Sequence, residues 1–221
     1  MNGFLQQPDI RDNRYPLSKI VVPQKRTIQS RYHKPGRIMD QGDTPYCCGY
    51  AIQQLLQSEP VPQKGKTGEW FYREAKKIDE LGPSVSGTSV RAVLNVAKQK
   101  QFIESYYWAT NTNQIIDYLL RYGPVIAGTP WSSGMEQPNK NGVVKITGTK
   151  KGNHAWLIVG VNLITGLFHG VNSYGHNFGM GGQFSITIKD FDTLFEQARQ
   201  GKSGPCVAAA AIEPGTNLRN K

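Results

Sequence analysis

The sequence predicts an α+β fold in which a helical half comes before a β half. Apolar residues recur at helical spacing in four segments between residues 47 and 122. Gly123 and Pro124 then form a strong stop signal for a helix. After this point the chain changes to short runs of β-branched and aromatic residues, separated by turns rich in glycine and asparagine. Helices and strands that are segregated in this way are typical of the α+β class.

The first predicted helix begins at Cys47 and ends before Pro60. Its apolar face consists of Ala51, Ile52, Leu55 and Leu56. The other three predicted helices are those over residues 69–78, from Thr88 or Ser89, and from Thr112 or Asn113. In the second half, strands are predicted over residues 125–128, 143–146, 156–161, 167–171, 184–188 and 207–212. One more short strand is predicted over residues 20–22.

We expect three parts along the chain. Residues 1–39 are polar and rich in Pro, Lys and Arg, and they form an extended arm that packs on the body. Residues 40–123 form a helical lobe with the nucleophile helix, and residues 124–221 form a β lobe. A boundary near Gly123 places a cleft between the two lobes, where substrates tend to bind.

Composition limits the class of protein. The 221 residues are 38% hydrophobic and 19% charged, which fits a folded chain. The N-terminus lacks the pattern of a signal peptide, and no apolar run is long enough to span a membrane. The three cysteines include an adjacent pair, so neither a disulfide framework nor zinc-ligand spacing is present. We expect a cytoplasmic protein without metal or cofactor and without membrane contact.

The net charge is +10, which draws the protein toward polyanions. Basic residues are spread along the chain, and the densest group is Lys25, Arg26, Arg31, Lys34 and Arg37. No zinc-finger, RNP or helix-turn-helix pattern accompanies them. Contact with nucleic acid or an acidic partner therefore stays an open alternative to an ordinary basic surface.

The most informative segment joins a glutamine, a cysteine and a helix start. Gln41 lies six residues before Cys47, and Cys47 opens the first predicted helix. A side-chain amide can stabilise an oxyanion, and a helix N-terminus favours a thiolate. Cys47 rather than Cys48 has the six-residue offset, so Cys48 is expected to be a packing residue.

A base and its orienting partner lie far downstream. His154 opens the most hydrophobic predicted strand, and Asn172 follows a later one. An asparagine can fix the tautomer and orientation of a histidine ring without adding charge. Cys, His and Asn in this order predict a nucleophilic site.

At these residues the chain resembles the papain-like cysteine peptidases, and most closely their bacterial and phage-type branch without a prodomain. Asp40-Gln41-Gly42 looks like the family's oxyanion-glutamine segment, and Asn153-His154-Ala155 looks like its histidine strand. Asn172-Ser173-Tyr174-Gly175 looks like its Asn-Ser-Trp-Gly block. The resemblance runs from about residue 40 to residue 214. It implies a two-lobe fold, with a helical lobe, an antiparallel β-barrel-like lobe and an active-site cleft between them.

The resemblance also implies a function, a cysteine-type endopeptidase acting on a polypeptide substrate. Cys47 is the implied nucleophile, His154 the base, Asn172 its orienting partner and Gln41 the oxyanion donor. Tyr174 stands where the family has a tryptophan that shields the Asn–His contact. The other implied substrate-binding residues are Gly87, Thr88, Ser89, Gly152, Asn153 and Ala155.

Two departures from the family pattern keep other functions open. Pro45 and Tyr46 replace small residues before the nucleophile, and a tyrosine there is expected to crowd the oxyanion site. The alternative is a structural or interaction protein on the same fold, such as a virion-associated component with an assembly partner in a phage particle. A cleft filled by Tyr46 or by the N-terminal arm favours that alternative. A lesser one is an NlpC/P60-type cell-wall endopeptidase, which requires neither Gln41 nor the Asn172 segment.

Overall fold

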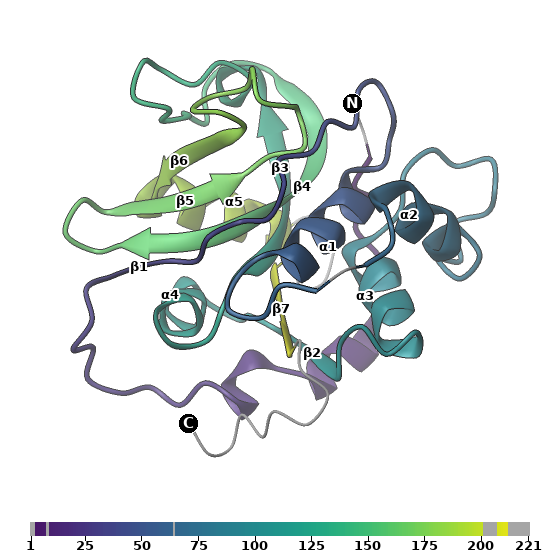
Figure 1. The fold of residues 1–221 in the computed structure, drawn as a ribbon, viewed down its shortest axis with the longest axis horizontal. Coiled ribbons are helices and arrows are strands. Elements are labelled where there is room, and N and C mark those ends of the chain that lie inside the picture. Colours follow the sequence, from purple (N-terminus) through teal and green to yellow (C-terminus); the bar gives the residue numbers. More distant parts are fainter. Residues whose placement is uncertain (1–2, 8, 64, 201–206, 212–221) are drawn as a thin grey trace.

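The computed structural model describes residues 3–7, 9–63, 65–200 and 207–211. It has the predicted α+β class, with helices packed against one antiparallel sheet (Figure 1). The helices are α1 (Cys47–Gln57), α2 (Gly68–Lys76), α3 (Val90–Gln99), α4 (Thr112–Arg121) and α5 (Ile188–Gln200). Short 3-10 helices are η1 (Ile10–Arg14), η2 (Leu17–Lys19) and η3 (Ser133–Met135).

The sheet is built around its longest strand. The strands are β1 (Ser30–Tyr32), β2 (Ser105–Trp108), β3 (Val125–Ser132), β4 (Lys150–Asn162), β5 (Leu167–Val171), β6 (Gln183–Thr187) and β7 (Val207–Ala211). Their order is β2-β7-β3-β4-β5-β6, and β1 pairs with β4. Along β4, the first part pairs with β3, and the last residues pair with β1. The strand that carries His154 is therefore paired over its whole length.

Two apolar cores lie on opposite faces of the sheet. Alternate residues of β4 point to opposite faces, so Leu157 joins one core and Trp156 the other. The core with Leu157 also contains the buried faces of α1, α2 and α3. The core with Trp156 contains those of α4 and α5. This layering anchors α1 directly on β4.

Side chains at the N-caps explain where three helices begin. Thr67, Ser89 and Asn111 each accept a hydrogen bond from a backbone N–H in the first turn of α2, α3 and α4. At α1 the N-cap is Tyr46, and it makes no such side-chain bond. The start of α1 therefore differs from those of α2, α3 and α4 in lacking a capping side chain.

The N-terminal arm wraps around the body (Figure 1). Asp12 is buried against α3 and β2, where it accepts from Arg91 Nε and from Trp108 Nε1, both at 3.0 Å. Farther along, Arg26 pairs with Asp117 of α4 at 2.8 Å. The arm then adds β1 to the sheet, and His33 is buried with its Nε2 2.8 Å from the Leu119 carbonyl oxygen.

Several local predictions were wrong in detail. Residues 20–22 form no strand, because Val21 packs into a core after η2 instead of pairing. Residues 143–146 make only an isolated bridge at Val143. The sequence also failed to indicate β1, β2 and α5. Helices α1 to α4 begin within two residues of the predicted starts, and β5 and β6 agree within two residues at both ends. Strands β3 and β4 are longer than the predicted 125–128 and 156–161, so His154 lies inside β4 rather than at its start. Residue 212 of the last predicted strand lies outside the described residues.

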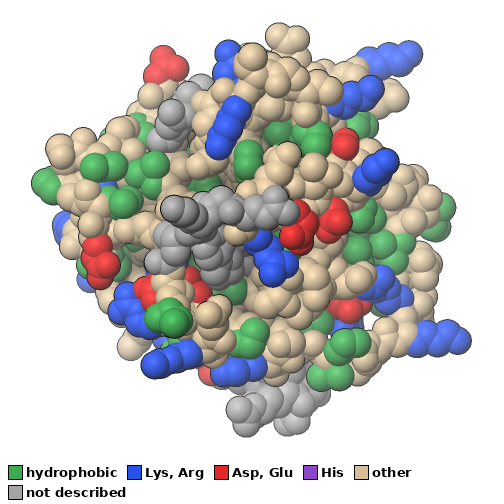
Figure 2. All heavy atoms as spheres, turned by 180° about the vertical axis from the view of Figure 1, so that it is seen from behind, with side chains coloured by type: hydrophobic (Ala, Val, Ile, Leu, Met, Phe, Trp, Pro, Cys, Tyr) green, Lys and Arg blue, Asp and Glu red, His purple; other side chains and the backbone are tan. Residues whose placement is uncertain are grey.

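The surface is mixed in charge. Figure 2 shows Lys and Arg side chains scattered over one face with acidic side chains among them. Within the described ranges, no helix is both long enough and apolar enough to cross a membrane.

The core that α5 closes should depend on Phe191, which is fully buried against Phe168 and Trp156. We expect Phe191→Ala to lower the free energy of unfolding by about 3–5 kcal/mol, because it leaves a cavity. Chemical denaturation monitored by circular dichroism measures this change. Ile164→Ala is the control, since Ile164 is 81% exposed and should change stability little. A loss at Phe191 no larger than the control's would contradict this assignment of the core.

Candidate active site

Cys47 is the first residue of α1, and its side chain is fully buried against β4. It shares a core with Ala155, the neighbour of His154 on β4. The aligned peptide dipoles of a helix favour negative charge at its N-terminus. The fold thus places one thiol where the backbone favours its ionised form.

His154 and Asn172 come together because β4 and β5 are neighbours. Leu157 of β4 pairs with Val171, the last residue of β5, so Asn172 follows opposite Trp156 and two residues from His154 on the same face of the sheet. The two side chains are joined by a bond of 2.8 Å between His154 Nε2 and Asn172 Oδ1. Both residues are buried, which protects this bond from water.

The hydrogen bonds of Asn172 fix the tautomer of His154. Asn172 Oδ1 also accepts from the Ser173 N–H at 2.8 Å, so this atom is the carbonyl oxygen of the amide. A carbonyl oxygen accepts only, and His154 Nε2 therefore carries a proton. This leaves Nδ1 as the ring nitrogen available to exchange a proton with Cys47.

The two adjacent thiols have opposite acidities. Burial opposes ionisation of Cys47, but hydrogen bonds from Cys48 and His154 and the charge on His154 bring its pKa well below the usual value. Burial and the neighbouring Cys47 raise the pKa of Cys48 well above it. Cys48 keeps its proton, with Sγ 3.3 Å from the Thr88 carbonyl oxygen. Cys47 is thus the more acidic thiol of the pair.

Two aromatic rings cover the His154–Asn172 pair. The Tyr174 ring lies 4.8 Å from the His154 ring between centroids, at an angle of 32°. The Trp131 ring meets the same imidazole edge-on at 5.0 Å. Burial, followed by the negative charge of Cys47, raises the pKa of Tyr174, which keeps its hydroxyl neutral. Rings on two sides of the imidazole hold it in one orientation.

The Gln41 amide is oriented by bonds at both ends. Its Oε1 accepts from Ser173 Oγ at 2.6 Å, and its Nε2 donates to the Thr44 carbonyl oxygen at 2.7 Å. A backbone hydrogen bond links the same two residues, since Gln41 N–H donates to the Ser173 carbonyl oxygen at 2.9 Å. The donor end of the amide therefore faces the loop that leads into Cys47.

The implied pocket residues before α3 lie near the adjacent thiol, since the Thr88 carbonyl oxygen is 3.3 Å from Cys48 Sγ. The Thr88 hydroxyl donates to the buried carboxylate of Asp79 at 2.9 Å, and Asp79 also pairs with Lys76. Ser89 Oγ accepts from Ala92 N–H as the cap of α3, and the Gly87 N–H donates to the Tyr72 hydroxyl. The side chains of Thr88 and Ser89 are thus already bonded within the protein.

The remaining residues of the implied pocket lie on β4. Gly152 and Asn153 pair with Trp131 and Pro130 of β3, and Ala155 is buried beside Cys47. Tyr46 does not crowd the Gln41 amide as expected. Its ring packs instead on Tyr72 of α2 with centroids 4.3 Å apart.

Gly3 of the N-terminal arm also lies at the site; the sequence left open that the arm fills the cleft but indicated no residue for this contact. A Cβ built on Gly3 would stand 2.8 Å from Cys47 Sγ. Ser173 and Trp131 were missed as well. Ser173 was visible in the Asn172 segment, whereas Pro130 suggested that the strand ended before Trp131.

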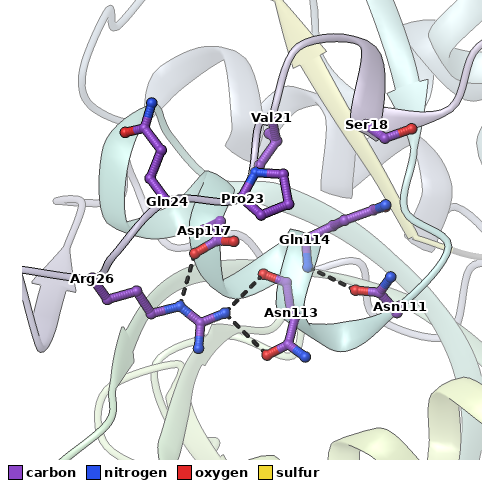
Figure 3. Close-up of a pocket in the computed structure, with 9 residues that line it drawn as sticks. All are labelled: Ser18, Val21, Pro23, Gln24, Arg26, Asn111, Asn113, Gln114 and Asp117. Carbon is purple, nitrogen blue, oxygen red and sulfur yellow. Dashed lines mark hydrogen bonds and ion pairs between the residues drawn. The ribbon is translucent and has the colours of Figure 1, made fainter.

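A cavity of about 580 Å³ lies elsewhere, between the N-terminal arm and the start of α4 (Figure 3). Its polar side chains mostly bond one another: Arg26 Nε donates to Asp117, and its NH2 group donates to Asn113 Oδ1 at 3.0 Å. Among the described residues, no group of three His, Cys, Asp or Glu side chains could hold a metal ion.

Comparison with solved structures identifies the fold. Xylellain, a cysteine protease from Xylella fastidiosa, superposes with a TM-score of 0.73 over 96% of this chain and 97% of its own, at 17% identity. The chain has the papain-like fold. The same fold appears in procathepsin L2 from Tenebrio molitor, with a TM-score of 0.61, 14% identity and coverage of 96% and 78%.

The inhibitor-bound bromelain structure from Ananas comosus also shares the papain-like fold. Its TM-score is 0.60 at 12% identity, with coverage of 85% of this chain and 100% of bromelain. No family model matches the sequence, and no curated protein matches it. At these identities the likeness shows the papain-like fold alone.

The lowered pKa of Cys47 predicts how its reactivity depends on pH. The thiolate should persist well below the usual thiol pKa of about 8.5 and be lost only as the pH falls through the lowered value. We expect the relative rate of Cys47 alkylation by iodoacetamide, followed by mass spectrometry, to stay level through neutral pH and to fall in acid.

His154→Ala tests the cause of this pH profile. It removes a hydrogen bond and a charge that favour the thiolate, while burial still opposes ionisation. The alkylation midpoint should therefore move to higher pH. A wild-type midpoint at or above the ordinary thiol value would count against the thiolate assignment.

Proposed function

We propose that the chain is a cysteine-type endopeptidase that hydrolyses peptide bonds. The observation that carries the proposal is a series of two hydrogen bonds. The buried, acidic thiol of Cys47 at the start of α1 is bonded to His154, and His154 is bonded to Asn172. A thiolate paired with an imidazolium, which an amide holds in one tautomer, is suited to nucleophilic attack on a carbonyl. The papain-like fold supports the same proposal.

The first half of the reaction acylates the enzyme. Cys47 Sγ attacks the scissile carbonyl carbon and forms a tetrahedral intermediate with a negative oxygen. Gln41 Nε2 and the backbone N–H of Cys47 stabilise that oxygen. His154 then gives its Nδ1 proton to the leaving amine, the C–N bond breaks, and a thioester to Cys47 remains.

The second half regenerates the thiolate. His154 takes a proton from water, and the resulting hydroxide adds to the thioester carbonyl. Collapse of this intermediate breaks the C–S bond and releases a carboxylic acid. Asn172 keeps the imidazole aligned in both halves.

Covalent labelling tests the proposed nucleophile. A peptide epoxide should modify Cys47 in the folded, reduced protein, and Cys47→Ala should abolish both labelling and peptide hydrolysis. Cys48→Ser is the matched control, because it keeps a hydroxyl donor beside Cys47 and should still be labelled. Labelling confined to Cys48, or hydrolysis that survives Cys47→Ala, would exclude the proposed nucleophile.

The role of Gln41 gives a sharper prediction. Gln41→Ala should lower kcat/KM for peptide hydrolysis by about 100- to 1000-fold, the usual loss of one oxyanion donor. Ser173→Ala should cause a smaller loss of the same kind, because it frees the amide to rotate.

Alkylation of Cys47 by iodoacetamide is the control measurement for Gln41→Ala and Ser173→Ala. No oxyanion forms in that reaction, so its rate should change little in either variant. Equal losses in hydrolysis and alkylation would mean that the two variants disturb the thiol rather than the oxyanion.

One observation favours a second candidate, a structural or interaction protein on this fold with reduced or absent peptidase activity. The chain's own residues 3–5 occupy the region beside Cys47. This candidate predicts that the biological role survives Cys47→Ala and that the protein copurifies with a larger particle.

A further inference from the structure

Gln54 is a buried amide on the face of α1 that carries the thiol. It is 2% exposed and follows Cys47 by seven positions, so the two side chains lie on one side of the helix, two turns apart. The helix residues around it, Ala51, Ile52 and Leu55, are buried and apolar. An amide in such surroundings costs free energy unless it is bonded, so its partner is informative.

The partner of Gln54 is the peptide group between Asn172 and Ser173. Gln54 Nε2 donates to the Asn172 carbonyl oxygen at 3.1 Å. Because a carbonyl oxygen only accepts, the end of the amide that faces it must be the NH2 group. On the other side of the same peptide, Ser173 N–H donates to Asn172 Oδ1 at 2.8 Å. A peptide group is planar, so these two bonds hold one rigid unit from both sides.

The orientation of this peptide group bears on the imidazole. Asn172 Oδ1 accepts from Ser173 N–H and also lies 2.8 Å from His154 Nε2. Rotation of the peptide would turn the Ser173 N–H away from Oδ1 and free the Asn172 side chain to rotate. The imidazole would then lose the acceptor that keeps a proton on Nε2.

The sheet holds the backbone only up to this point. Val171 is the last residue of β5, and it pairs with both β4 and β6. The Asn172 N–H donates to the Gly182 carbonyl oxygen at 3.0 Å, which holds the peptide before Asn172. The carbonyl of Asn172 belongs to the next peptide, beyond the strand. Gln54 therefore supplies there the kind of bond that the sheet supplies to the preceding residues.

We propose that Gln54 is a positioning residue that holds His154 with its proton on Nε2, acting through the peptide between Asn172 and Ser173. The inference rests on the proposed function for its catalytic consequence. Its effect on the site can be measured without peptidase activity, because the acidity of Cys47 reports on how His154 is held.

Gln54→Met tests the proposal, since it keeps a long buried side chain and removes the donor. The hydrogen bond and charge of His154 lower the pKa of Cys47, so a poorly held imidazole should let that pKa rise. The midpoint of Cys47 alkylation by iodoacetamide should move to higher pH by about 0.5 to 1 unit, the size of one hydrogen bond. The variant leaves Cys48, His154 and Tyr174, the titratable neighbours of Cys47, in place.

The same variant has an expected effect on hydrolysis. The kcat for a peptide substrate should fall about tenfold, while KM changes little, because Gln54 acts on the imidazole rather than on the bound peptide.

Gln53→Met is the matched control on the same helix. Gln53 is also buried, and its Oε1 accepts from the Gly68 N–H at 2.6 Å, away from Asn172. This variant loses a buried hydrogen bond of the same kind, so it should unfold at a lower temperature but keep the wild-type alkylation midpoint. Thermal unfolding monitored by circular dichroism shows whether each variant is folded, and Gln54→Leu replaces Gln54→Met if the latter is not.

The wild-type protein provides a check that needs no variant. In NMR spectra the side-chain amide protons of Gln54 should exchange with solvent far more slowly than those of the exposed Gln24, because they are buried and bonded. Exchange as fast as that of Gln24 would overturn the inference.

The alkylation midpoints decide the rest. An unchanged midpoint in Gln54→Met, or an equal shift in Gln53→Met, would also overturn the inference. A shift specific to Gln54, in a protein that hydrolyses no peptide, supports the positioning role and counts against the peptidase proposal. Peptide hydrolysis that depends on Cys47, together with an unchanged midpoint, supports the peptidase proposal and excludes the positioning role.

Discussion

The packing of α1 on β4 is the contact on which the candidate site depends. It sets Cys47, the first residue of the helix, against the strand that carries His154. A second link runs from the middle of the helix, where the buried Gln54 side chain donates to the Asn172 carbonyl oxygen at 3.1 Å. One helix therefore fixes both the thiol and the residue that orients the imidazole, and a small tilt of α1 would disturb the whole chain of contacts.

The parts of the site that the sequence could predict are those with local signatures. Cys47 is preceded by Gln41 at a fixed offset and followed by a helical pattern, and His154 and Asn172 stand at the ends of apolar runs. The distance between His154 and Asn172 depends on the register of β4 and β5. A resemblance to a known fold can predict this register, but the spacing of residues along the sequence cannot. Ser173 acts on Gln41 across 132 positions of sequence, and no local pattern encodes such a contact.

The failure to predict β1, α5 and the end of β3 also has physical reasons. β1 has three exposed residues, so it carries no alternating apolar pattern, and its pairing comes only from the free side of β4. α5 begins directly after β6 with no intervening turn, which made its apolar start look like the end of a strand. Trp131 was missed because it follows Pro130, a residue that usually ends a strand. This part of β3 lies beyond its pairing with β7, and a proline is tolerated there because one edge of the strand is unpaired.

The N-terminal arm contacts the body at two distant places, near Cys47 and along the end of β4. Residues 3–5 lie over the thiol, whereas residues 30–32 complete the ladder along Gly160–Asn162 at the far end of the His154 strand. Loss of the whole arm would leave backbone N–H and C=O groups of β4 without partners, which is the kind of exposed edge that templates aggregation. Residues 3–5 can therefore move away from the thiol without disturbing the sheet, as long as residues 30–32 stay paired with β4.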